Sequence, residues 1–279
     1  IFVHPLPKKI DVLQFYNSNY YTLNVQSPLY IKGLVKKIKS SLDAINILNI
    51  IDKYLNSDID SILDIGCGNL DKLIEIKRRL KTNNPNISCT GIDIDFCQTD
   101  IQQAQTLGIN VLSSDIEGLD FDDILVKADV VILSQVLEHL RYPNKFLLSL
   151  YQKLPPKSLL IIDTPNSGGL DYYIFKQKYW GGYHIPRHLH IYNQISLQCL
   201  VLKSSFQILE QGFKPSPGFW IISLRNTLGL NSIRKSKSLL DIFDFSNITL
   251  IFIFAFIDFI IIKCGFSTSN QYLIAQKPK

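Results

Sequence analysis

The stretch Asp64-Ile65-Gly66-Cys67-Gly68 combines an acid with two glycines, residue types that can hold a nucleotide-like ligand. Gly66 and Gly68 have no Cβ, so they allow a tight turn and let a ligand lie against the backbone. Asp64 adds a carboxylate just before that turn. This spacing predicts a turn that binds a ligand through close contact with its backbone and through one carboxylate.

The segments on both sides of the turn predict how it is positioned. Ile62, Leu63 and Ile65 are typical of a buried parallel strand, and an apolar helical pattern runs from Leu73 to Leu80. A strand, a glycine turn and a helix N-terminus form the usual ligand crevice of an open α/β sheet. The alternative is a strand that ends in a glycine turn and binds nothing.

The glycine pattern narrows the class of ligand. A dinucleotide fingerprint requires G-x-G-x-x-G, and its last position is Asp71 in this chain. The remaining D-x-G-x-G resembles motif I of the class I S-adenosylmethionine (SAM) methyltransferases. The resemblance implies that Asp64 fixes the loop and faces the ammonium group of SAM, and that Gly66, Cys67 and Gly68 lie against the cofactor.

A second strand is expected to end at Asp93, where an acid can accept hydrogen bonds from both ribose hydroxyls. Asp95 is a neighbour that could take the same role. Asp93 is preferred because it follows a Gly-Ile pair, as in the family. Asp93 and Ile94 are therefore assigned to the ribose of SAM.

Later strand ends add further residues that match the family. Asp115 and Ile116 correspond to its adenine site, although Asp115 taken alone is more often a turn residue or helix cap. Ser134 and Gln135 correspond to the positions that flank the methionine portion of SAM. His139, in a Glu-His segment, is interpreted as a structural hydrogen-bonding residue rather than a base.

A distinctive segment at residues 179–192 contains aromatic residues, a glycine pair and three histidines around Arg187. It resembles the Pro-Arg-His-Leu stretch of a methyltransferase subfamily with ubiquinone-type and sugar- or lipid-directed members. Arg187 is a candidate to bind an acceptor carboxylate or phosphate. His184 or His188 is a candidate to take a proton from an acceptor hydroxyl. Alternatively, Arg187 and His188 cap the next helix and pin the loop.

The resemblance implies an α/β fold with a doubly wound, seven-stranded Rossmann-like sheet. Its strand order is 3-2-1-4-5-7-6, the last strand is antiparallel, and an apolar helical insertion precedes that strand. Expected strands lie at 62–65, 86–94, 109–112, 128–133, 159–163, 206–211 and 270–277. Expected helices lie at 28–55, 73–80, 97–107, 144–154 and 196–205.

Three domains are predicted. Residues 1–55 form an N-terminal lid and helix, residues 56–213 with 270–279 form the SAM-binding domain, and residues 214–269 form a basic and apolar helical insertion. No metal site is expected, because the five cysteines show no metal-ligand spacing.

The insertion contains a run at 248–262 that is apolar except for Thr249 and Asp258. This run is shorter than the roughly 20 residues of a spanning helix. A buried helix, a subunit interface and a membrane-interfacial helix all fit, and peripheral membrane contact through 220–265 is favoured.

The composition is that of a globular protein, with 46% hydrophobic and 19% charged residues among 279. A net charge of +5 without long basic runs argues against a nucleic-acid partner. Reduced thiols and the lack of a visible signal peptide predict a cytoplasmic protein, peripheral at the inner face of a membrane. No Met occurs, so we expect the chain to begin downstream of the true start.

These features predict a SAM-dependent methyltransferase that modifies a small-molecule, glycan or lipid-linked acceptor at oxygen. One alternative is a non-catalytic, membrane-associated scaffold in which Leu70, where the family often has a third glycine, blocks the cofactor. A nicotinamide-dependent oxidoreductase is the other alternative, and the absent third glycine of the dinucleotide fingerprint argues against it.

Overall fold

A computed structural model describes residues 1–8, 29–56, 58–81, 84–118, 127–175, 178–229, 242–243 and 247–279. The chain forms two compact units. The sheet unit comprises 36–162, 198–210 and 273–279, and the helical unit comprises 1–35, 163–197 and 211–272. Most of the predicted lid, residues 9–28, lies outside the described residues, and the predicted three-domain division stays a prediction.

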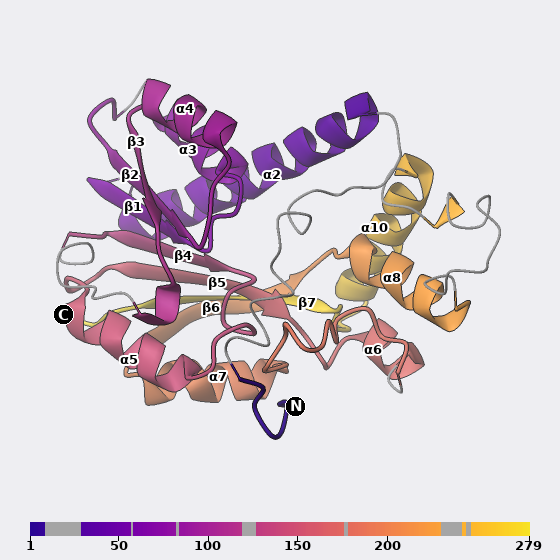
Figure 1. The fold of residues 1–279 in the computed structure, drawn as a ribbon. Helices are drawn as coiled ribbons and strands as arrows, with labels where there is room; N and C mark the ends of the chain where they lie inside the picture. The colour runs from indigo at the N-terminus through magenta and orange to yellow at the C-terminus, as the bar shows by residue number, and fades with distance from the viewer. Residues whose placement is uncertain are drawn as a thin grey trace. The chain divides into compact units, whose positions relative to one another are not determined.

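The chain builds a seven-stranded sheet of order β3-β2-β1-β4-β5-β7-β6, with the last strand antiparallel (Figure 1). This confirms the predicted Rossmann-like topology. The strands are β1 (Ser61–Ile65), β2 (Ser88–Asp93), β3 (Ile109–Ser113), β4 (Val130–Ser134), β5 (Leu159–Pro165), β6 (Gln207–Lys214) and β7 (Asn270–Gln276).

The strands nearest the glycine turn pair in parallel and are buried on both faces. β1 pairs with β2 and β4, and β2 pairs with β3. Four of the five β1 residues and four of the five β4 residues are buried, as expected when helices cover both faces of a parallel sheet. The carboxyl ends of these strands therefore meet at one edge of the sheet.

Helices cover the two faces of the sheet unit, with α3 and α4 on one face and α5 on the other (Figure 1). The helix α3 buries Leu73, Ile74 and Ile76 and carries Arg78 and Arg79 near its end, which is an amphipathic pattern. The helices that contribute to this unit are α2 (Leu29–Leu55), α3 (Asp71–Leu80), α4 (Gln98–Thr106), η1 (Ile116–Gly118), α5 (Pro143–Lys153) and α7 (Gln194–Lys203).

The helical unit contains α6 (Leu170–Phe175), α8 (Pro217–Thr227) and α10 (Ile248–Lys263). The rings of Trp220 on α8 and Phe254 on α10 stack with centroids 5.6 Å apart. Within the described parts of the chain, no helix is both long enough and apolar enough to cross a membrane. Among the described residues of the apolar insertion before the last strand, α8 and α10 are helical, as predicted.

The structure differs from the predicted elements in several places. β2 begins at Ser88 rather than 86, β4 begins at Val130 rather than 128, and α6 was not predicted. β6 continues through Gly212 to Lys214 instead of ending at 211. A Cβ on Gly212 would lie 2.8 Å from Tyr272 Cε1, so this glycine lets the Tyr272 ring cross the strand and does not end it.

Candidate functional site

The turn after β1 has the tight geometry that its glycines predict. Gly66 and Gly68 have φ values of 69° and 63°, in the left-handed region that favours glycine. The amides of Gly66 and Cys67 donate to Ile92 O on β2, at 2.7 and 3.2 Å. A Cβ on Gly66 would lie 2.5 Å from Val136 Cγ2, so only glycine fits there.

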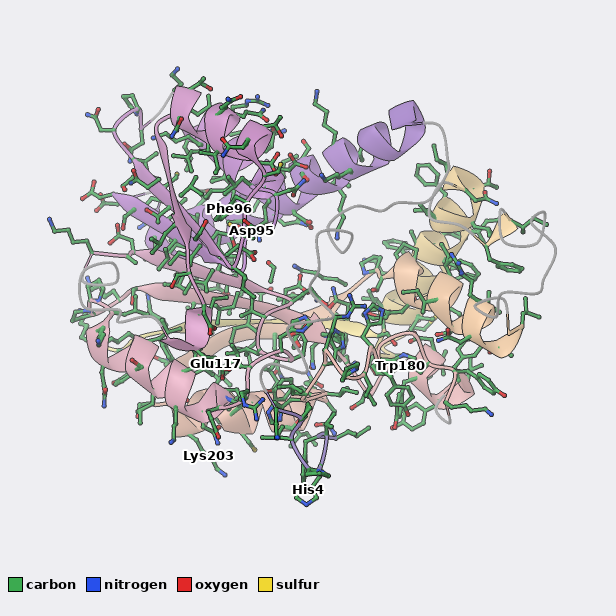
Figure 2. All side chains as sticks on the ribbon, viewed as in Figure 1. His4, Asp95, Phe96, Glu117, Trp180 and Lys203 are labelled. Atoms are coloured by element: carbon green, nitrogen blue, oxygen red, sulfur yellow. The ribbon has the colours of Figure 1, made fainter. Side chains whose placement is uncertain are left out.

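Asp93 joins the end of β2 to this turn. Its Oδ2 accepts from Gly68 N at 2.7 Å, and its Oδ1 accepts from Ile94 N at 2.7 Å. A Cβ built on Gly68 meets no atom within 4 Å, so open space adjoins this backbone. Asp95, the alternative acid, is exposed and accepts from its neighbour Phe96 N at 2.8 Å (Figure 2).

Asp64 is fully buried at the centre of the site and is paired with a lysine that the sequence analysis did not single out. Lys72 Nζ, from the first turn of α3, lies 3.1 Å from Asp64 Oδ1 and donates to Ser134 Oγ at 2.9 Å. Burial raises the pKa of Asp64, and Lys72 opposes that rise. Among the described residues, Asp64 Oδ2 accepts no hydrogen bond, which leaves an acceptor for an ammonium or hydroxyl group.

Leu70 occupies the position of the family's third glycine without filling the ligand side of the turn. It adopts the glycine-like conformation, with φ 63°, yet its side chain is fully buried. A Cβ on Gly91 would lie 2.5 Å from Leu70 Cδ2 and 2.9 Å from Cys67 Sγ. Both side chains therefore point toward β2. Leu70 does not block the turn, and Cys67 offers a ligand only its backbone.

The segment after β3 approaches the same turn. A Cβ on Gly66 would lie 3.9 Å from Ile116 Cδ1, so Ile116 and Val136 flank the first glycine. Asp115 Oδ1 accepts from Glu117 N at 3.2 Å and starts the short helix η1, as a capping residue would. Gln135 is exposed with φ 56° directly after β4. Asp64, Asp93 and Asp115 thus lie at the carboxyl edge of adjacent strands.

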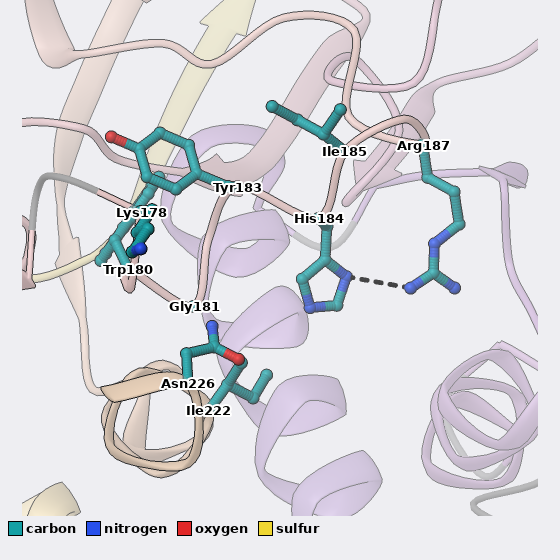
Figure 3. Close-up of a pocket in the computed structure, with 9 residues that line it drawn as sticks. All are labelled: Lys178, Trp180, Gly181, Tyr183, His184, Ile185, Arg187, Ile222 and Asn226. Atoms are coloured by element: carbon teal, nitrogen blue, oxygen red, sulfur yellow. Dashed lines mark hydrogen bonds between the residues drawn. The ribbon is translucent and has the colours of Figure 1, made fainter. Parts of the chain in front are cut away.

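The predicted loop segment lines a separate pocket of about 670 Å³ within the helical unit (Figure 3). Aromatic and aliphatic groups form its walls, and two cationic side chains and one imidazole add polarity. Its lining residues are Lys178, Trp180, Gly181, Tyr183, His184, Ile185, Arg187, Ile222 and Asn226.

His184 and Arg187 act as one unit in this pocket. Arg187 Nη2 and His184 Nδ1 are 3.3 Å apart, and a guanidinium can only donate. Nδ1 must therefore accept, which places the proton of the neutral imidazole on Nε2. Burial, reinforced by Arg187, lowers the pKa of His184 to about 4, so the ring is neutral at pH 7. His184 thus offers an Nε2–H donor rather than a base.

His188 lies deeper and has the opposite tautomer. Its Nδ1 is 2.8 Å from Gly182 O, which can only accept, so Nδ1 carries the proton and Nε2 is the basic nitrogen. The contact also holds the loop in place, which is the alternative role considered for His188. The cap of α7, by contrast, is Asn193, whose Oδ1 accepts from Ser196 N at 2.9 Å.

Trp180 explains the glycine pair of the loop. The indole is 1% exposed, and its Nε1 donates to Ser269 Oγ at 2.7 Å (Figure 2). A Cβ on Gly182 would lie 2.2 Å from Trp180 Cη2, and one on Gly181 would lie 2.7 Å from Phe219 O of α8. The glycines let the loop pack closely on the indole and on α8.

Comparison with known proteins decides the family. A family model described as a methyltransferase domain matches residues 39–211, which is more than half of the chain. The chain belongs to the class I SAM-dependent methyltransferases.

Curated relatives of this methyltransferase include two ubiquinone biosynthesis O-methyltransferases. The Rickettsia bellii protein is 30% identical over 176 residues, covering 60% of this chain and 63% of the relative. The Rickettsia prowazekii protein is 28% identical over 186 residues, covering 64% of each chain. The match therefore spans less than two thirds of each relative's length.

Solved structures show the same fold. A SAM-dependent methyltransferase from Archaeoglobus fulgidus has a TM-score of 0.50 at 21% identity, covering 85% of this chain and 94% of that chain. A Haemonchus contortus phosphoethanolamine N-methyltransferase has a TM-score of 0.52 at 16% identity, covering 83% of this chain and 52% of that chain.

The site of this methyltransferase suits SAM, the cofactor of its class. The unsatisfied Asp64 Oδ2 fits an ammonium group, the Asp93 carboxylate fits a ribose diol, and Gly68 leaves room for close approach. SAM supplies a methyl group on a sulfonium. The residues named above would hold and orient it. Lys72 was not predicted from the sequence to be part of this site.

Proposed function

We propose that the protein transfers the methyl group of SAM to an oxygen of a small, lipid-linked acceptor that carries an anionic group. The observation that carries this proposal is the unit formed by His184 and Arg187 in an otherwise largely apolar pocket. The relatives named as ubiquinone O-methyltransferases support oxygen as the acceptor atom and a lipid-like molecule as the acceptor.

The pocket's chemistry favours an acceptor with two parts. Arg187 and the Nε2–H of His184 are donors that recognise a carboxylate or phosphate, and Lys178 adds positive charge. Tyr183, Ile185 and Ile222 offer a ring and an aliphatic surface for an aromatic or isoprenoid body. Burial, with a contribution from Tyr172, raises the pKa of Tyr183 to about 12, so its phenol stays neutral.

Methyl transfer to a hydroxyl requires that its proton be removed as the carbon–oxygen bond forms and the carbon–sulfur bond breaks. Between the two candidate histidines, His188 has the tautomer with a basic Nε2, whereas the Nδ1 of His184 already accepts from Arg187. We therefore assign anion binding to His184 and Arg187, and we assign His188, which is buried and does not line the pocket, to holding the loop in place.

The test compares a phenol that bears a carboxylate with its methyl ester, measuring S-adenosylhomocysteine formation. We expect Arg187→Gln to raise KM for the carboxylate roughly 10- to 100-fold and to leave KM for the ester nearly unchanged. We expect Lys178→Gln to have a smaller effect on KM for the carboxylate. Equal losses on acid and ester in Arg187→Gln would refute the anion-binding role.

A further inference from the structure

The helix α10 exposes a continuous apolar stripe. Five large exposed side chains at positions 252, 253, 256, 259 and 260 follow an i, i+1, i+4, i+7, i+8 spacing, which places them on one helix face. Phe252, Phe256 and Phe259 are 67%, 62% and 50% exposed. Thr249 begins the face and Lys263 ends it, and Phe266 just beyond is 59% exposed.

The opposite face of α10 holds the stripe in this orientation. Asp258, the one acid within the helix, is 1% exposed and accepts from Trp220 Nε1 at 2.8 Å and from Ser216 N at 2.6 Å. Burial raises the pKa of Asp258, and these donors lower it. This buried carboxyl and the Trp220–Phe254 stack attach α10 to α8, so the phenylalanines face outward.

The stripe is too short to span a bilayer. The 16 residues of α10 extend about 24 Å, compared with a hydrocarbon core of about 30 Å. A helix of this kind, apolar on its outer face and attached by its inner face, can lie in the plane of a membrane interface.

The charges of the helical unit select one kind of surface. In its described residues, each carboxylate is withdrawn from the surface: Asp163 is paired with Lys214 at 2.6 Å, and Asp171 and Asp258 are buried. Lys8, Lys178 and Lys263 are exposed. The exposed charge of these described residues is thus positive, which attracts anionic headgroups, and Lys263 lies beside Phe259 of the stripe.

We propose that α10 binds the surface of an anionic membrane, with Phe252, Phe256 and Phe259 inserted at the boundary between headgroups and acyl chains. Lys263, whose Nζ lies 5.5 Å from the centroid of the Phe259 ring, reaches the phosphates at the edge of the stripe. This contact does not depend on the proposed acceptor and brings the whole protein to a lipid surface.

The experiment is co-sedimentation of the full chain with vesicles, without cofactor or acceptor. Vesicles of phosphatidylglycerol and phosphatidylcholine in equal amounts are compared with pure phosphatidylcholine. We expect binding to the anionic vesicles that weakens as salt is added. The triple variant F252N/F256N/F259N should bind roughly 1,000-fold more weakly, since each inserted ring contributes about tenfold. K263E should weaken binding to the anionic vesicles alone.

The matched control removes two apolar side chains that are equally exposed on another helix. Ile195 and Leu202 of α7 are 69% and 56% exposed, and I195N/L202N should bind as the wild type does. Binding of S-adenosylhomocysteine confirms that each variant is folded. Wild-type binding by the triple variant would overturn the proposal. So would failure of the wild type to bind anionic vesicles, or dimers that the triple variant abolishes.

Discussion

Lys72 Nζ lies 3.1 Å from Asp64 Oδ1, so the acid of the glycine turn is neutralised by the first turn of the helix that the turn starts. Asp64 is fully buried and the Lys72 side chain is 14% exposed. A buried carboxylate in this setting needs a cation nearby to remain ionised. The pair therefore favours the ionised form of Asp64, whose Oδ2 can still accept from an ammonium group.

Lys72→Met should destabilise the protein more at pH 8 than at pH 5. Burial raises the pKa of Asp64 and Lys72 lowers it, so the variant raises that pKa further. At pH 8 the uncompensated carboxylate costs about 3 kcal/mol of unfolding free energy, and at pH 5 a proton replaces the lost charge. Urea denaturation at both pH values measures the difference.

Arg79→Met is the control for this variant, because Arg79 pairs with Glu75 on the exposed face of the same helix. We expect it to cost less than about 0.5 kcal/mol at either pH. Equal losses at pH 5 and pH 8 for Lys72→Met would show that the lysine acts by packing and not by charge.

Asp93→Asn should weaken SAM and S-adenosylhomocysteine binding by roughly 10- to 100-fold, because an amide cannot accept on both sides as the carboxylate does. Asp95→Asn is the matched control, since Asp95 accepts from Phe96 N and not from the turn. Calorimetric titration of both variants decides between the two acids. Comparable weakening of binding by Asp95→Asn would contradict the assignment of the ribose to Asp93.

Gly91→Ala should destabilise the sheet unit by about 1–3 kcal/mol through overpacking. The added methyl would lie 2.5 Å from Leu70 Cδ2 and 3.3 Å from Leu73 Cδ2, where neither side chain is exposed. Gly118→Ala is the control, because nothing lies within 4 Å of its Cβ position. Thermal unfolding measures both, and an unchanged melting temperature for Gly91→Ala would contradict the packing of Leu70 described above.

The contribution of Asp171 to the free energy of unfolding should decrease as the pH rises. Burial, with a contribution from Asp258, raises its pKa from 3.8 to about 6. The folded state then holds this proton more tightly than the unfolded state. The associated stability is complete below pH 3.8 and is lost as the pH rises through 6, about 3 kcal/mol in all.

Asp171→Asn should remove this part of the decline and gain stability relative to the wild type at pH 8. Asp58→Asn, at an exposed position, should retain the wild-type slope. Unfolding free energies from pH 4 to pH 8 provide the comparison. A wild-type slope in Asp171→Asn would mean that another group binds the proton.

Much of the fold could be predicted from local sequence patterns. Strand β1, the glycine turn and α3 follow from a short apolar run, two glycines and an amphipathic period, all properties of neighbouring residues. The order of the later strands came from the family resemblance, and the sheet confirms it.

The features that could not be predicted depend on contacts between residues that are far apart in the sequence. Lys72 meets Ser134 across 62 positions, and α8 supplies Ile222 and Asn226 to a pocket assigned to the loop at 179–192. Asp258 looked like an interruption of an apolar run, but its partners are Ser216 and Trp220. Periodicity within one segment cannot reveal such partners, because the fold alone brings them together.

Leu70 also couples the conformation of the glycine turn to the packing beneath β2. A glycine in that turn could change conformation without disturbing anything beneath it. Here, any rearrangement of the turn must withdraw a large side chain from under Gly91 and open a void in the interior. A ligand that holds the turn in this conformation would therefore also stabilise the packing of Leu70 against β2.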